Sequence, residues 1–252
     1  MGRTARKKSS TGIYHVIVRG VNREPIFYED EDRFLYLESL AKAKKKAPFL
    51  VHAYCLMDNH VHLLLQETTE SIGDTLRRIG SSYVYGFNRK YERVGHLFQG
   101  RFTSETVEND SYFLTAFRYI HQNPVKAKIT QHCAEYEWSS YGVYSNNDCH
   151  SKNLVDTTFA LDLAGGRQQL LMFINTKNND KCLDLESVNR LSDVEFITIA
   201  KTLLNGEPVS KLTGMHPGER DMILRMLKSI DGASIRQISR LTGLGRWVIS
   251  NA

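Results

Sequence analysis

The residue pair in this sequence best suited to chemistry is His60 and His62, which one residue separates. They begin a strand-like run, DNHVHLLL. Because side chains alternate along a strand, both imidazoles would lie on one face and Val61 on the other. Two imidazoles side by side on a rigid strand are natural ligands for a divalent metal. A pair of half-exposed structural histidines would have the same spacing, so this motif alone leaves both interpretations open.

A second candidate group is Tyr119 with Asn123, four residues apart in a predicted helix over 111–122 and therefore on one helix face. The helix is expected to end near Asn123 because Pro124 follows. A tyrosine hydroxyl is a nucleophile when a phosphate is held and polarised beside it. A metal on the histidines could do this, and the Asn123 oxygen could complete a Mg²⁺ or Mn²⁺ site. Tyr112 is the alternative nucleophile, and a packed core aromatic is the alternative interpretation of Tyr119.

The elements that would position these groups follow from periodicity and turn residues. We expect strands over 12–20, 50–57 and 60–66, a strand within 94–108, and helices over 29–46, 71–91 and 111–122. This order predicts an α+β, ferredoxin-like antiparallel sheet with helices on one face. His15, in the first strand, is interpreted as structural. The buried side of the first helix is expected to hold Phe34, Leu37, Leu40 and Ala41.

Composition is that of a globular protein, with 252 residues, 41% hydrophobic and 24% charged, and a formal net charge of +5. The basic residues are concentrated in 1–23, which has no acid, and in 77–101, where Glu92 is the one acid. Such clusters suit a polyanion such as nucleic acid, although a solvated basic face is the alternative. The aromatics between the basic residues of 77–101 are either core residues or base-stacking platforms.

Localisation is inferred from what the sequence lacks. The four cysteines have irregular spacings without a CxxC pair, which is typical of neither a zinc site nor a disulfide framework. No apolar signal-peptide core follows the basic N-terminus, and no stretch is long enough for a membrane-spanning helix. We therefore expect a cytoplasmic protein without a membrane partner.

A polar stretch over 146–152 predicts a linker between two domains, residues 1–145 and 146–252. The second is expected to be helical, with a helix-turn-helix-like module at about 219–252. Ser234 would cap its first helix, and Arg246 and Trp247 would open its recognition helix. An ordinary small helical bundle is the alternative.

Several segments together resemble a known family. DNHVHLLL resembles the HUH motif, and RYIHQNPVKAKI resembles the tyrosine helix of single-tyrosine HUH transposases. The likeness is greatest to the REP-associated tyrosine transposases, and it extends over about residues 12–145 through YHVIVRGVNREPIF, FNRKYERVGHLFQGRF and EWSSY. The resemblance implies a divalent metal held by His60 and His62, with Asn123 as a third ligand. It also implies Tyr119 as the nucleophile that leaves a 5′-phosphotyrosine and a free 3′-hydroxyl.

We therefore predict a metal-dependent single-strand DNA transposase or endonuclease that cleaves and rejoins single-stranded or hairpin DNA near repeats. Its state as a monomer or homodimer stays open. The basic residues expected to contact DNA are Arg19, Arg23, Arg77, Arg78, Arg89, Lys90, Arg101, Lys126 and Arg246. The alternatives are a DNA-binding regulator that uses the helix-turn-helix without catalysis, and a replication-initiator or relaxase-type nickase.

Overall fold

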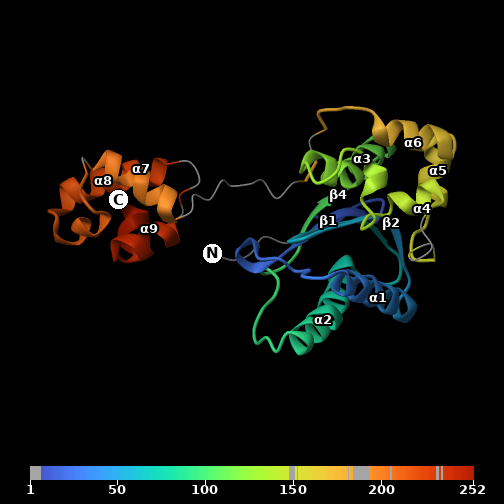
Figure 1. The fold of residues 1–252 in the computed structure, drawn as a ribbon, viewed down its shortest axis with the longest axis horizontal. Coiled ribbons are helices and arrows are strands. Elements are labelled where there is room, and N and C mark those ends of the chain that lie inside the picture. Colours follow the sequence, from blue (N-terminus) through green and yellow to red (C-terminus); the bar gives the residue numbers. More distant parts are fainter. Residues whose placement is uncertain are drawn as a thin grey trace. The chain divides into compact units, whose positions relative to one another are not determined.

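The computed structural model describes residues 7–147, 151, 153–180, 182–183, 193–204, 206–230, 233 and 235–252. The chain forms two compact units, Met1–Asp184 and Leu185–Ala252, and each is described by itself (Figure 1).

The first unit is built on a four-stranded sheet with the order β2-β3-β1-β4, in which all neighbours are antiparallel. Its strands are β1 (Ile13–Arg19), β2 (Phe49–Met57), β3 (His60–Glu67) and β4 (Thr103–Thr106). With α1 (Asp30–Lys46) after β1 and α2 (Ile72–Lys90) after β3, the chain follows the β-α-β-β-α-β order of ferredoxin-like folds. The predicted antiparallel α+β sheet is confirmed.

The prediction that helices cover one face of the sheet was wrong. Helices α1 and α2 lie on one face, and α3 (Asp110–Lys126) lies on the other (Figure 1). Two neighbouring residues of β1 illustrate this. Val18 lines a cavity together with residues of α1 and α2. Ile17 is on the other face, where it pairs with His62, and the ring of His62 lies near Tyr119 of α3. Nearly every residue of β2 is buried, as expected for a strand that is covered on both faces.

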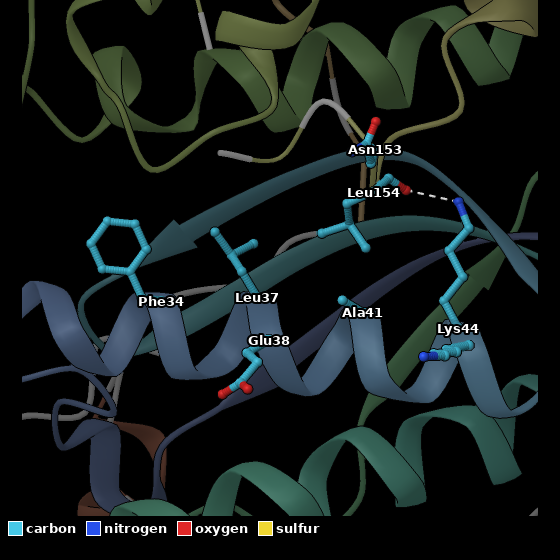
Figure 2. A pocket seen from close by; sticks show the side chains of 8 residues that line it. Phe34, Leu37, Glu38, Ala41, Lys44, Asn153 and Leu154 are labelled. Carbon is cyan, nitrogen blue, oxygen red and sulfur yellow. Dashed lines mark hydrogen bonds between the residues drawn. The ribbon is translucent and has the colours of Figure 1, made fainter. Parts of the chain in front are cut away.

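The buried face of α1 also differs from the prediction. Leu40 is buried as predicted, and Tyr36 and Ala43 are buried beside it. The predicted core residues Phe34, Leu37 and Ala41 instead line a groove of about 520 Å³ along the outer side of α1, together with Leu154 (Figure 2). Both sets have helical spacing, so periodicity could not choose between them. In the groove, the Lys44 ammonium donates a hydrogen bond of 2.8 Å to the Leu154 carbonyl.

Helix α3 begins where the sequence predicts and ends later. The Asn109 side chain accepts a hydrogen bond of 2.8 Å from the Tyr112 N–H, which caps the helix. The helix continues through Pro124 to Lys126, so the expected end near Asn123 was wrong by three residues. Pro124 lies in the last turn, where the Ala127 N–H still donates to the Asn123 carbonyl at 2.9 Å. The longer helix keeps Asn123 in helical register with Tyr119.

The first unit extends past the boundary predicted at residue 145. Helices α4 (Tyr141–Ser145), α5 (Thr158–Ala164) and α6 (Arg167–Asn175) pack into the same core as the sheet. The apolar residues that follow the predicted linker, among them Leu154 and Val155, lie in the core of the first unit, so the unit continues beyond residue 145. The short 3₁₀ segments of this unit are η1 (Val21–Arg23) and η2 (Cys133–Glu135).

The second unit is helical, as predicted. It contains α7 (Asp193–Leu203), η3 (Val209–Gly214), α8 (Pro217–Ser229), α9 (Ile235–Thr242) and α10 (Arg246–Asn251). Its own core includes Phe196, Leu212, Leu224, Leu227, Ile238 and Ile249. Ser234, the predicted cap, lies outside the described residues. Of the helices in the described parts of the chain, none has the length and apolar character needed to cross a bilayer.

Candidate active site

The paired histidines lie on the sheet face that α3 covers. In the β1–β3 register, His60 is opposite Arg19 and His62 is opposite Ile17. The two imidazole rings are 4.9 Å apart between centroids, His62 is fully buried, and His60 is half-buried. The predicted placement of both rings on one strand face agrees with this geometry.

The hydrogen bonds of Asn59 set the tautomer of His60. The Asn59 amide nitrogen donates to the Arg23 carbonyl at 3.1 Å, so the amide oxygen is the acceptor toward His60 Nδ1 at 2.7 Å. The Nδ1 atom must therefore carry the proton, and in the neutral ring the lone pair is on Nε2. Metal-binding histidines are commonly oriented by such a contact on the second ring nitrogen.

His62 is oriented by His15, which the sequence interpretation had treated as merely structural. The His15 Nε2 and His62 Nδ1 atoms are 3.1 Å apart, and the two rings are stacked with centroids 5.4 Å apart. His62 Nε2 is buried and has no hydrogen-bond partner in the described parts of the chain. If His62 donates from Nδ1 to His15, its buried Nε2 presents a lone pair, as a metal ligand requires.

Burial keeps these imidazoles neutral. The pKa of His62 is well below its usual range, chiefly because burial disfavours the charged ring, with smaller effects from His60 and His15. Burial lowers the pKa of His15 to about 3. At neutral pH both rings are therefore uncharged, and the lone pairs on their nitrogens are free of competing protons.

Tyr119 reaches the same place from α3. The centroid of its ring is 5.9 Å from that of His62 and 6.0 Å from that of His15, and 5% of Tyr119 is exposed. The Lys126 ammonium lies 4.2 Å from the centre of the Tyr119 ring. A phenol, an ammonium and two imidazoles thus converge from β1, β3 and α3.

Tyr112, the alternative nucleophile, has a different environment. Its hydroxyl donates a hydrogen bond to the Glu105 carboxylate of β4. Burial and this carboxylate raise the pKa of Tyr112 well above its usual range. A phenol held in its protonated form by a carboxylate is a poor nucleophile, so the geometry favours Tyr119 over Tyr112.

Asn123 lies on the same helix face as Tyr119 and is largely buried. Its amide nitrogen donates to the Tyr119 carbonyl at 2.9 Å, which leaves the amide oxygen as the atom that could bind a cation. Within the described residues, no group of three or more His, Cys, Asp or Glu side chains is placed to hold a metal. A metal at this site would therefore depend on the two imidazoles and on amide, phosphate or water oxygens.

Of the basic residues predicted to contact DNA, Arg19 and Lys126 are near this site. Arg19 is the direct cross-strand neighbour of His60, so the two side chains share a face. Lys126 lies over the Tyr119 ring. Arg23 is in the 3₁₀ segment η1, where its carbonyl accepts from Asn59.

The other basic residues differ in how firmly the fold holds them. Arg89 and Arg101 are exposed, and Arg77 forms an exposed ion pair of 2.9 Å with Asp74. Arg78 is paired with Glu70, and Lys90 lies 2.9 Å from the buried carboxylate of Asp32. The side chain of Arg246 lies outside the described residues. Arg78 and Lys90 thus have structural partners, whereas Arg89 and Arg101 present their charge to solvent.

The aromatic residues of α2 belong mainly to the core. Tyr83 and Phe87 are fully buried, and the Tyr91 hydroxyl donates to Asp32 at 2.8 Å. Tyr85 is 71% exposed. The base-stacking interpretation of this helix therefore does not apply to Tyr83 or Phe87.

Comparisons with known proteins agree with this fold. Residues 8–123 match the family described as Transposase IS200 like. A Haemophilus influenzae protein named as a candidate REP-associated tyrosine transposase is 23% identical in an alignment of 121 residues, and the match covers 42% of this chain and 69% of that protein. A solved REP-associated tyrosine transposase bound to a REP hairpin has the same fold, with a TM-score of 0.54 and 16% identity over 73% of this chain and 96% of that chain. Residues 8–123, within the first unit, are thus similar to IS200-like transposases, and among these to REP-associated tyrosine transposases.

Proposed function

We propose that this protein is a metal-dependent single-strand DNA transposase that cleaves and rejoins DNA through a 5′-phosphotyrosine intermediate. The observation that carries the proposal is the convergence of Tyr119 of α3 with His62 of β3, at 5.9 Å between ring centroids. The match of residues 8–123 to IS200-like transposases supports the same assignment.

The covalent step uses the Tyr119 hydroxyl. Its oxygen loses a proton and attacks the phosphorus, so that an O–P bond forms to the 5′ side of the DNA. The P–O3′ bond breaks, and the 3′ oxygen takes up a proton. Lys126 supplies a positive charge beside the ring where the phenolate forms. Because one phosphoester replaces another, the reverse attack by a 3′-hydroxyl rejoins DNA without ATP.

His60 and His62 would hold Mg²⁺ or Mn²⁺ through their Nε2 atoms, with the Asn123 amide oxygen as a third ligand. The oriented imidazoles fit this role, as does the buried, neutral ring of His62, whose Nε2 has no hydrogen-bond partner among the described residues. When bound, the cation would act as a Lewis acid on a phosphoryl oxygen. Three neutral ligands would leave its charge undiminished for that purpose.

The proposed substrate is single-stranded DNA that carries a hairpin. Support comes from the solved relative, which was bound to a REP hairpin, and from the exposed basic side chains of Arg77, Arg89 and Arg101. Such a surface binds phosphates with a strong salt dependence.

The second unit is proposed to add a further DNA contact through α9 and α10. Gly243 joins these helices with a φ of 77°, and Trp247 of α10 is 77% exposed. The arrangement resembles a helix-turn-helix, although α10 has six residues, so its contact with a groove would be short.

The test is an assay with a labelled hairpin oligonucleotide and Mn²⁺, in which the protein–DNA adduct is separated on a denaturing gel. We expect an adduct with the natural chain and none with Tyr119→Phe. His60→Ala and His62→Ala should also form none while they keep most of their affinity for DNA. Duplex binding without any adduct would instead support a regulator. Normal cleavage by both histidine variants would refute the metal role.

A further inference from the structure

The opposite face of the sheet carries a cavity that the proposed chemistry does not use. It has a volume of about 400 Å³ and lies between β1, α2 and the loop before β4. Its apolar lining includes Val18, Tyr36, Leu76, Phe98 and Phe102. Because Val18 and His62 lie on opposite faces of the sheet, this cavity is separate from the candidate active site.

Gly80 keeps the cavity open at the cost of helix propensity. Apart from proline, glycine is the residue least suited to a helix interior, and Gly80 is in the middle of α2. A Cβ atom there would lie 3.7 Å from the Phe98 ring, which is ordinary van der Waals contact. Packing therefore does not require glycine at this position. A larger side chain would project toward the Phe98 ring and fill the space.

The rim of the cavity is basic. Arg77 and Arg101 both line it, and both are exposed. Arg101 has no ion-pair partner among the described residues. A second cavity, of about 430 Å³, shares Gly73 and Phe102 with the first and is lined by Lys7 and Lys8 as well as by Glu67 and Glu70. In the first cavity, aromatic surface thus adjoins positive charge, and no carboxylate from the part of the chain that the structure describes lines it.

We propose that this cavity binds one unpaired nucleobase of the DNA, which stacks on Phe102 or Phe98 while the flanking phosphates contact Arg77 and Arg101. This inference rests on the proposed function, because it assigns a second binding site for the same single-stranded substrate. Stacking of bases on aromatic side chains, combined with basic groups along the backbone, is the general physical basis of single-strand binding. The apolar interior with cations at the rim matches a nucleotide, which has an apolar ring face and an anionic backbone.

The test is photocrosslinking of the full chain to a thymidylate decamer that contains 5-iododeoxyuridine, followed by tryptic mass spectrometry. Phe98 falls in the peptide VGHLFQGR (residues 94–101), and Phe102 begins the peptide over 102–118. We expect crosslinks at one or both phenylalanines.

In parallel, Gly80→Leu and Phe102→Leu should each lower affinity for the decamer about 10-fold, because one stacked base is lost. Tyr85→Ala is the matched control, since Tyr85 is an exposed aromatic on the same helix, and its affinity should be unchanged. Melting curves check that each variant is folded. The two variants disturb the cavity in opposite ways, because Gly80→Leu fills it and Phe102→Leu removes an aromatic ring.

Adduct formation at Tyr119 is measured on the same preparations to separate the two proposals. If the chain binds the decamer and forms the adduct with hairpin DNA, but crosslinks lie only outside Phe98 and Phe102 and both folded variants bind normally, the nucleobase site is overturned. If the chain binds no single-stranded DNA, both the proposed function and this site fail.

Discussion

His121 of α3 makes the stability of the first unit sensitive to acid. The ring is fully buried, and its two nitrogens contact the Phe117 carbonyl and the Ser140 hydroxyl, each at 2.8 Å. Burial lowers the pKa of His121 from 6.5 to about 4, and the Phe117 carbonyl opposes this shift only in part. The folded state therefore binds a proton at His121 less readily than the unfolded state does.

The sign and size of the effect follow from proton linkage. Because the folded pKa is depressed, this contribution to stability is fully present above about pH 6.5 and is lost as the pH falls toward 4. Each pH unit within that window is worth about 1.4 kcal/mol, so lowering the pH from about 7 to about 5 costs roughly 2 kcal/mol. For a unit of this size, that corresponds to a decrease in Tm of about 4–8 °C.

The measurement compares the decrease in Tm between pH 7 and pH 5 for the natural chain and for His121→Gln. Gln keeps an amide that can occupy the same contacts but has no proton to gain in this range, so its decrease should be smaller by about 4–8 °C. His132→Gln replaces an exposed histidine and serves as the control. If the natural chain and His121→Gln show the same decrease in Tm between pH 7 and pH 5, the buried neutral state of His121 is refuted.

Four further predictions concern the two kinds of basic residue, metal binding and the extent of the catalytic unit. Lys90→Met should lower the free energy of unfolding by about 1 kcal/mol, because the buried carboxylate of Asp32 loses a charged partner. Arg89→Gln should leave the Tm unchanged and reduce the slope of log affinity for single-stranded DNA against log salt by about 0.7. A lower Tm with an unchanged slope would contradict the assignment of Arg89 as an exposed residue that contacts DNA. His15→Leu should weaken Mn²⁺ binding at the histidine site about 10- to 100-fold, measured by electron paramagnetic resonance of free Mn²⁺, and unchanged binding would argue against an orienting role. A chain that ends at Asp184 should still form the tyrosine–DNA adduct with hairpin DNA, since the convergent groups all lie in the first unit, and loss of the adduct with a normal Tm would show that the second unit contributes to the site.

Local patterns predicted much of the fold. Alternation placed His60 and His62 on one face, and helical spacing placed Tyr119 with Asn123, because both relations depend only on residues near in sequence. The boundaries of β1, α1, β2 and β3 follow from the same kind of signal.

The features that sequence reasoning missed depend on contacts between distant segments. His15 joins the site through the register of β1 against β3, which no local pattern specifies. The second covered face of the sheet could have been predicted from β2. Its residues are apolar almost without interruption, whereas a strand with one exposed face alternates apolar and polar residues. The cavity at Phe98 and Phe102 combines a loop with two helices and a strand, so it could not be predicted from any one segment.

The most direct test of the central claim maps the residue that becomes covalently attached to DNA. Trypsin places Tyr112 and Tyr119 in different peptides, residues 102–118 and YIHQNPVK (residues 119–126). After reaction with hairpin DNA and nuclease digestion, mass spectrometry should find a nucleotide on Tyr119 in YIHQNPVK. A nucleotide on Tyr112, or an adduct that persists in Tyr119→Phe, would contradict the convergence of Tyr119 with the paired histidines as the catalytic centre.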